Sequence, residues 1–146
     1  MKKINFNRGW SFSLNGGEAT TVDLPHDFSI SQPRSADAAS GPDGGYFPGG
    51  FGEYNRILAP NPGRRTGLLF DGSFGVTEVY INDNLAAINR YGYNGFFVDL
   101  TEYLTEDEDN RLNVRVNNKW QPNARWYTGS GLYRDVYLCD SAYSYI

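Results

Sequence analysis

The sequence predicts an all-β protein, an antiparallel sandwich or jelly roll with one or two short helical turns. Three observations carry this prediction. Short segments alternate apolar and polar residues with a period of two, which is the pattern of strands that bury one face. Gly, Asn, Asp and Pro separate these segments, and tight turns use those residues. The composition, with 11 Tyr and 3 Trp among 146 residues, favours pleated, half-buried surfaces.

The alternation marks a series of short strands, and two local signals refine it. The expected strands are 5–14, 20–24, 54–58, 67–70, 78–82, 85–88, 112–117 and 132–138. Asp83–Asn84 lies between two of them, and both residues tolerate a left-handed backbone, which predicts a hairpin. Asp99 is a cap-like acid with Glu102 three residues later, which predicts one helical turn.

Charge and rare residues exclude several classes of protein. The chain has 13 Lys and Arg against 17 Asp and Glu, with no basic stripe, so nucleic acid is not an expected partner. Cys139 is the single cysteine and stands in an apolar alternation, which indicates a buried thiol. His26 is the single histidine, so no metal site or cofactor is expected. Without a signal sequence or membrane span, the chain is expected to be cytoplasmic.

Two long segments, 29–52 and 117–131, are irregular, and the second has the residue types of a sugar site. Loops longer than about 12–15 residues are usually functional or disordered. A sugar ring needs an aromatic platform, here Trp126 or Tyr127, and planar polar groups, here Gln121, Asn123 and Arg125. A structural role stays open, in which Trp126 packs under a loop and Arg125 pairs with an acid.

The residues do not predict catalysis by this chain alone. Glycoside hydrolysis needs two carboxylates placed across one bond. Glu53, Glu78 and Glu102 each fit a solvent-facing strand or a cap instead. His26 and Asp27 are adjacent, so on an extended chain their side chains point opposite ways and a catalytic triad is not expected.

The order of several motifs resembles the N-terminal, sugar-binding domain of glycoside hydrolase family 2, the family of β-galactosidases, β-glucuronidases and β-mannosidases. The motifs cover most of the chain. They are FNRGWSF at 6–12, LPHDFSI at 24–30, GGYFPGGFGEY at 44–54, LLFDGSFGVTEVYIND at 68–83, YGYNGFFVDLT at 91–101, NRLNVRVNN at 110–118 and RWYTGSGLYRDVYL at 125–138.

This resemblance implies a galactose-binding-like jelly roll over residues 1–138, with 139–146 beginning a linker to a missing immunoglobulin-like domain. In the family a barrel with two catalytic glutamates follows, and neither glutamate has a counterpart here. The chain is therefore expected to be an inactive part of a retaining enzyme, most like bacterial β-galactosidases. Its expected partners are a β-galactoside-type carbohydrate and the two other domains, not nucleic acid or a membrane.

The resemblance also assigns residues. Loops of this domain lean over the barrel mouth in the family, which implies a pocket wall made by Asp43, Asn123, Arg125, Trp126 and Tyr127. The family signatures further contain residues with a role in the fold, namely His26, Asp27, Tyr46, Arg134 and Asp135. The sequence departs from some β-galactosidases, which place Asn where Gly41 stands and Asp where Arg125 stands.

Two alternatives of other classes remain open from the sequence. One is a stand-alone carbohydrate-binding module that holds sugar without a barrel. The other is a purely structural domain of a β-glucuronidase- or β-mannosidase-type enzyme that does not touch the substrate.

Overall fold

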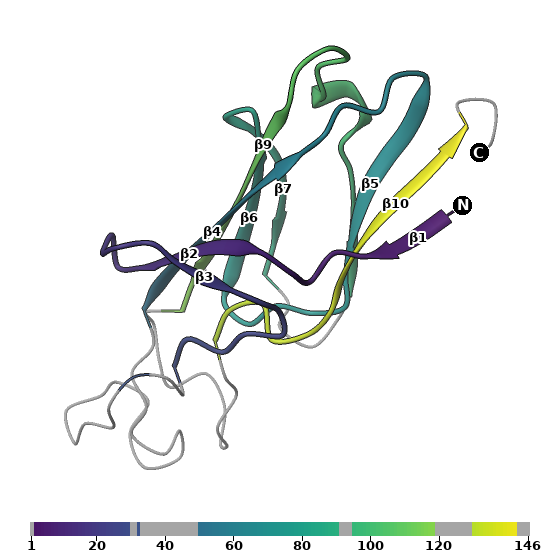
Figure 1. Cartoon of the computed structure of the whole chain (residues 1–146). Coiled ribbons are helices and arrows are strands. Elements are labelled where there is room, and N and C mark those ends of the chain that lie inside the picture. The colour runs from purple at the N-terminus through teal and green to yellow at the C-terminus, as the bar shows by residue number, and fades with distance from the viewer. Residues whose placement is uncertain (1, 30–31, 33–49, 91–94, 119–129, 143–146) are drawn as a thin grey trace.

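A computed structural model describes residues 2–29, 32, 50–90, 95–118 and 130–142 of the chain. The described strands form two antiparallel sheets that face each other (Figure 1). The four-stranded sheet has the order β1 (Lys2–Asn5), β10 (Val136–Ala142), β5 (Arg64–Phe70), β8 (Phe96–Asp99). The six-stranded sheet has the order β3 (Thr20–Val22), β2 (Trp10–Leu14), β4 (Phe51–Leu58), β9 (Asn110–Asn117), β6 (Val76–Ile81), β7 (Asn84–Asn89).

The predicted all-β class, the antiparallel pairing and a short helical turn are confirmed. The turn is the 3₁₀ helix η2, Thr101–Tyr103, where Asp99 Oδ1 accepts a 3.0 Å hydrogen bond from Thr101 N. None of the helical segments in the described part of the chain has the length and apolar character of a membrane span.

The core lies between the sheets and is rich in aromatic rings. Trp10, Phe28 and Tyr54 are fully buried there. The alternation in the sequence places Trp10 and Tyr54 on the buried faces of β2 and β4. Phe28 lies outside the strands and stacks on Phe12, the cross-strand partner of Tyr54. Each large apolar side chain that is buried in this way stabilises the fold by about 1.5–3 kcal/mol.

The first predicted strand, 5–14, is in fact two strands in different sheets. β1 ends at Asn5 and pairs with β10, whereas β2 begins at Trp10 and pairs with β4. Gly9 has a φ of +74°, and the Phe6 carbonyl accepts hydrogen bonds of 2.8 Å from Trp10 Nε1 and Arg56 Nη1. These tertiary contacts hold the crossing between the sheets, although the apolar alternation continues through it.

The predicted hairpin between β6 and β7 is present, but its turn lies one residue earlier than expected. Asn82 and Asp83 both have positive φ, 50° and 67°, and Ile81 pairs with Asn84. Two central residues with positive φ define the turn type that suits the twist of a hairpin. The Asn82 side chain fixes this register, because its Nδ2 donates to Asn110 Oδ1 at 2.7 Å and its Oδ1 accepts from Arg111 N at 2.9 Å.

The last strand begins and ends later than the predicted 132–138. β10 runs over Val136–Ala142 and pairs with β5 as far as Ala142–Arg64. The domain boundary expected after residue 138 therefore falls inside a strand, and residues 139–142 belong to the sheet rather than to a linker. Cys139 is 1% exposed, which confirms a buried thiol, and burial raises its pKa.

Candidate functional site

The residues that flank the two long irregular segments lie together at one edge of the sandwich. Gly50 N donates to Asn118 O at 3.3 Å, and Asn118 N donates to Gly50 O at 2.8 Å. The hydroxyls of Ser29 and Ser130 are 2.5 Å apart. Ser29 and Gly50 flank 30–49 (where only Gln32 is described), and Asn118 and Ser130 flank 119–129. We call these four residues the loop edge.

Asp27 ties two chain segments of this edge with one carboxylate oxygen. Its Oδ1 accepts hydrogen bonds from Ser29 N at 2.9 Å and from Ser130 N at 3.0 Å. The first bond closes a local turn, in which an Asp side chain accepts from the backbone two residues later. The second spans 103 positions of sequence. Hydrogen bonds to a charged acceptor are stronger than neutral ones, so Asp27 is a firm anchor for the loop edge.

A chain of buried polar side chains completes the edge. Asn118 Nδ2 donates to Ser130 Oγ at 2.6 Å, and Ser130 Oγ in turn contacts Ser29 Oγ. Ser29 and Ser130 are fully buried, and Asn118 is 4% exposed. A buried polar group that loses its partner costs about 1–3 kcal/mol. The chain of bonds therefore favours one relative position of the segments that meet here.

His26 binds the hydroxyl of buried Tyr54 beside this edge. The distance from His26 Nδ1 to the Tyr54 oxygen is 2.8 Å, and Leu132 N donates to the same oxygen at 3.4 Å. Burial raises the pKa of Tyr54, so the hydroxyl stays protonated and donates to Nδ1. Burial also lowers the pKa of His26, against the opposing charge of Asp27, so the ring is neutral at pH 7.

Gly131, which follows Ser130 of the loop edge, packs closely on the aromatic core. Its φ is +100°, and its N–H and C=O both pair with Phe74. A Cβ at this position would meet the Tyr54 hydroxyl and would lie 2.9 Å from the Phe28 ring. Only glycine fits both the backbone conformation and the space.

The geometry of this edge suits positioning rather than bond breaking. His26 is held by a tyrosine and Asp27 by backbone amides, so the two do not form a catalytic relay. In the described ranges, no cluster of three or more His, Cys, Asp or Glu side chains could hold a metal ion. The edge fixes where the two long segments start and end.

The family of the chain follows from a match over more than half its length. Residues 59–142 match the family described as glycosyl hydrolases family 2, sugar binding domain. This chain belongs to that family. The resemblance drawn from the motifs is thereby confirmed.

Relatives of this sugar binding domain carry two kinds of enzyme name. The chain is 39% identical to β-galactosidase BoGH2A of Bacteroides ovatus, over 94% of this chain and 18% of that protein. It is 32% identical to a β-glucuronidase of Bacteroides fragilis, over 92% of this chain and 20% of that protein. The chain thus spans about a fifth of the length of these relatives.

Solved structures agree with the fold. A β-glycosidase from Bacteroides vulgatus superimposes with a TM-score of 0.91 at 31% identity, over 97% of this chain and 20% of that one. A glycosyl hydrolase family 2 member from Bacteroides cellulosilyticus gives a TM-score of 0.88 at 32% identity, over 97% of this chain and 21% of that one.

The predicted pocket wall of the sugar binding domain lies outside the described residues. This holds for Asp43, Asn123, Arg125, Trp126 and Tyr127, and also for Tyr46.

Two other residues assigned to the fold, Arg134 and Asp135, are described. The Arg134 guanidinium lies 5.4 Å from the centre of the Tyr133 ring. Asp135 Oδ1 accepts from Asn7 Nδ2 at 2.9 Å, and Asn7 Oδ1 accepts from Val136 N at 2.9 Å. These bonds attach the crossing after β1 to the start of β10.

Sequence reasoning did not find the polar chain of Ser29, Asn118 and Ser130. Two local signals were available: Asp27 stands two residues before Ser29, and Ser130 lies between two glycines. Neither signal shows that serines 101 positions apart meet in the fold.

Proposed function

We propose that this sugar binding domain is the non-catalytic N-terminal part of a retaining β-galactosidase. In that enzyme its loops form part of the sugar pocket wall, and the domain packs on a catalytic barrel carried elsewhere in the same protein. An immunoglobulin-like domain lies between the two. The chemistry belongs to the barrel, and this domain contributes binding and orientation.

The loop edge is the observation that carries the proposal. Asp43 belongs to one segment, and Asn123, Arg125, Trp126 and Tyr127 belong to the other. The flanks of both segments are joined by buried hydrogen bonds through Ser130. Both segments thus begin at one edge of the sandwich, which supports a pocket wall built from the two. The buried anchors would keep that wall in place without a large ordering cost when sugar binds.

The choice of galactoside rests on the relative of 39% identity, which is named a β-galactosidase. Relatives at 32% identity are named β-glucuronidases, and this makes a β-glucuronide the second candidate substrate. The two substrates differ by a carboxylate, and the pocket wall offers one arginine, Arg125, that would pair with it.

Steady-state kinetics on the full-length protein that contains this domain tests the proposal. Nitrophenyl β-galactoside, β-glucuronide and β-mannoside are compared by kcat/KM. We expect the galactoside to be preferred by at least about a hundredfold, the range that differential contacts at one sugar substituent supply. A preference for the glucuronide would overturn the galactosidase assignment. The 146-residue chain alone is expected to release no nitrophenol.

A further inference from the structure

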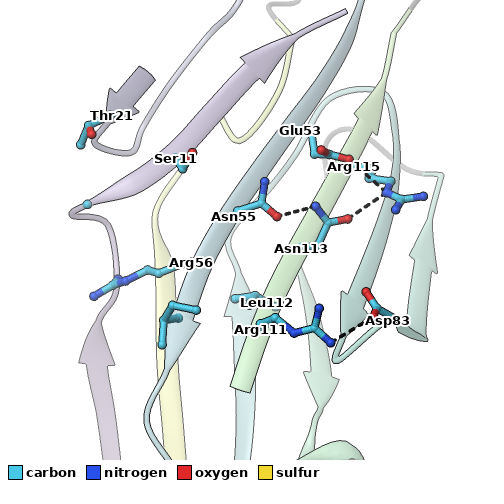
Figure 2. Close-up of a pocket in the computed structure, with 12 residues that line it drawn as sticks. Ser11, Thr21, Glu53, Asn55, Arg56, Asp83, Arg111, Leu112, Asn113 and Arg115 are labelled. Carbon is cyan, nitrogen blue, oxygen red and sulfur yellow. Dashed lines mark hydrogen bonds and ion pairs between the residues drawn. The ribbon is translucent and has the colours of Figure 1, made fainter. Parts of the chain in front are cut away.

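The outer face of the six-stranded sheet carries a groove that the proposed function does not use. Its volume is about 510 Å³, and its walls come from β2, β3, β4, β9 and the turn after β6 (Figure 2). Ligand pockets usually measure about 300–1,000 Å³. Glu53 and Asn55 line it, whereas Tyr54 between them points into the core. The groove thus lies on the opposite face of β4 from the Tyr54–His26 pair.

A ladder of planar polar side chains crosses the floor of this groove. Arg115 Nε donates to Asn113 Oδ1 at 2.8 Å, and Asn113 Nδ2 donates to Asn55 Oδ1 at 2.6 Å (Figure 2). Asn55 and Asn113 are cross-strand partners of β4 and β9. The sheet therefore holds the three side chains in a fixed order before any ligand arrives.

This ladder leaves hydrogen-bond donors available. Within the described residues, Asn55 Nδ2 and the two terminal nitrogens of Arg115 make no hydrogen bond to the protein. Figure 2 shows the terminal nitrogens of Arg115 turned away from Asn113. A ligand oxygen can accept hydrogen bonds from these donors.

Two of the three arginines that line the groove are paired with acids, which favours a neutral ligand over an anion. Arg115 pairs with Glu53 at 3.3 Å and Arg111 with Asp83 at 3.0 Å. Arg56 is occupied elsewhere, because Nη1 donates to the Phe6 carbonyl and the guanidinium lies 3.5 Å from the centre of the Phe6 ring. A free anion gains little from arginines that are already compensated. A hydroxyl, which both donates and accepts, can use the guanidinium and the carboxylate of one pair together.

The groove also offers an apolar contact. Ile57 is 56% exposed and follows Asn55 on the same face of β4. The C–H face of a sugar ring can lie against such a side chain while the ring hydroxyls reach the ladder. From this arrangement we propose that the groove is an accessory binding site for a neutral oligosaccharide, separate from the loop edge. This proposal does not depend on β-galactosidase activity.

A nuclear magnetic resonance titration of the ¹⁵N-labelled chain tests the proposal. The probes are β-1,4-galactotetraose, cellotetraose and xylotetraose, with tetragalacturonate as the acidic comparison. We expect at least one neutral tetrasaccharide to shift the side-chain amide signals of Asn55 and Asn113. His26 and Ser130 are expected to keep their positions. Asn113→Ala and Arg115→Ala should each weaken binding about fivefold, as loss of one hydrogen bond does.

Arg65→Ala is the matched control. Arg65 pairs with Asp99 at 2.7 Å on the four-stranded sheet, and its side chain is 42% exposed, against 41% for Arg115. This variant should bind as the unchanged chain does. The proposal fails if no neutral probe shifts the groove signals, if the shifts fall at the loop edge, or if tetragalacturonate binds more tightly.

Discussion

Asn118 and Ser130 are joined side chain to side chain across the base of the segment 119–129. The Asn118 amide donates to the Ser130 hydroxyl at 2.6 Å, and both residues are buried. The same hydroxyl contacts Ser29, which flanks the other long segment. Ser130, which follows the segment 119–129, thus connects the residues that precede both segments predicted to hold the sugar contacts.

The role of this serine predicts the effect of Ser130→Ala. The change removes the acceptor of the Asn118 amide and the partner of Ser29 inside the protein. The loss of these hydrogen bonds between buried groups should lower the free energy of unfolding by about 1–3 kcal/mol. Urea unfolding followed by tryptophan fluorescence measures it. Ser13→Ala, on the half-exposed face of β2, is the control and should change stability by less than about 0.5 kcal/mol. Equal effects of the two variants would contradict the anchoring role.

Gly131→Ala should be more damaging than an ordinary glycine substitution. The added methyl group would strike the Tyr54 hydroxyl and the Phe28 ring, on a backbone with φ of +100°. Backbone strain and overpacking cost about 1–3 kcal/mol each, so we expect a loss of roughly 3–5 kcal/mol. Gly63→Ala separates the two causes, because Gly63 has a φ of +76° with nothing within 4 Å of the added atom. If both variants lose the same stability, the clash is absent.

The pH dependence of stability should carry a contribution from His26. Burial lowers the pKa of the folded-state ring below its ordinary 6.5, so near pH 6 the unfolded chain binds more protons than the folded chain. Neutral His26 makes its full contribution to the free energy of unfolding above about pH 6.5. This contribution is lost as the pH falls through the lower folded-state pKa. Between about pH 7.5 and about pH 5 the Tm should therefore fall more for the unchanged chain than for His26→Gln. The glutamine can still accept from Tyr54 but does not titrate. Parallel Tm curves would show that His26 is not responsible.

The sequence predicts the two sheets of this fold well because buried and exposed side chains alternate along each strand, and this alternation is visible in the sequence. The alternation of Leu112, Val114 and Val116 gives β9 and its buried face directly. The alternation does not predict a strand boundary that a tertiary contact sets. The Phe6 carbonyl is such a case, because its hydrogen bonds hold the crossing between β1 and β2. The pattern also missed β8, which has four residues and includes Phe97 at 49% exposure, so its alternation is too short to read.

The candidate site was harder to predict for a related reason. Residue types and motif order predict that Arg125 and Trp126 contact sugar, but nothing local links their segment to Ser29. That link is made by Asp27 and Ser130 over 103 positions, and by the packing of Gly131 on Tyr54. The groove of Asn55 and Asn113 depends on strand register, which the period of a sequence does not give.

The last prediction concerns the proposed pocket wall, tested in the full-length protein that contains this domain. Arg125→Ala and Trp126→Ala should each lower kcat/KM by roughly ten- to a thousandfold. The physical reason is the loss of one polar or stacking contact, worth about 1.4–4 kcal/mol at the transition state. The isolated domain should bind galactose weakly or not measurably, because half a pocket cannot offset the desolvation of a small polar ligand.

Thermal unfolding of the same full-length variants separates binding from folding. Arg65→Ala, which removes an exposed ion pair on the four-stranded sheet, is the control and should keep both kcat/KM and Tm. For Arg125→Ala and Trp126→Ala we expect a large fall in kcat/KM with a Tm close to that of the unchanged enzyme. The opposite pattern, with kcat/KM retained and the Tm several degrees lower, would make both residues structural. In that case the loop edge would serve to hold the domain interface together, and the sugar would be bound by the barrel alone.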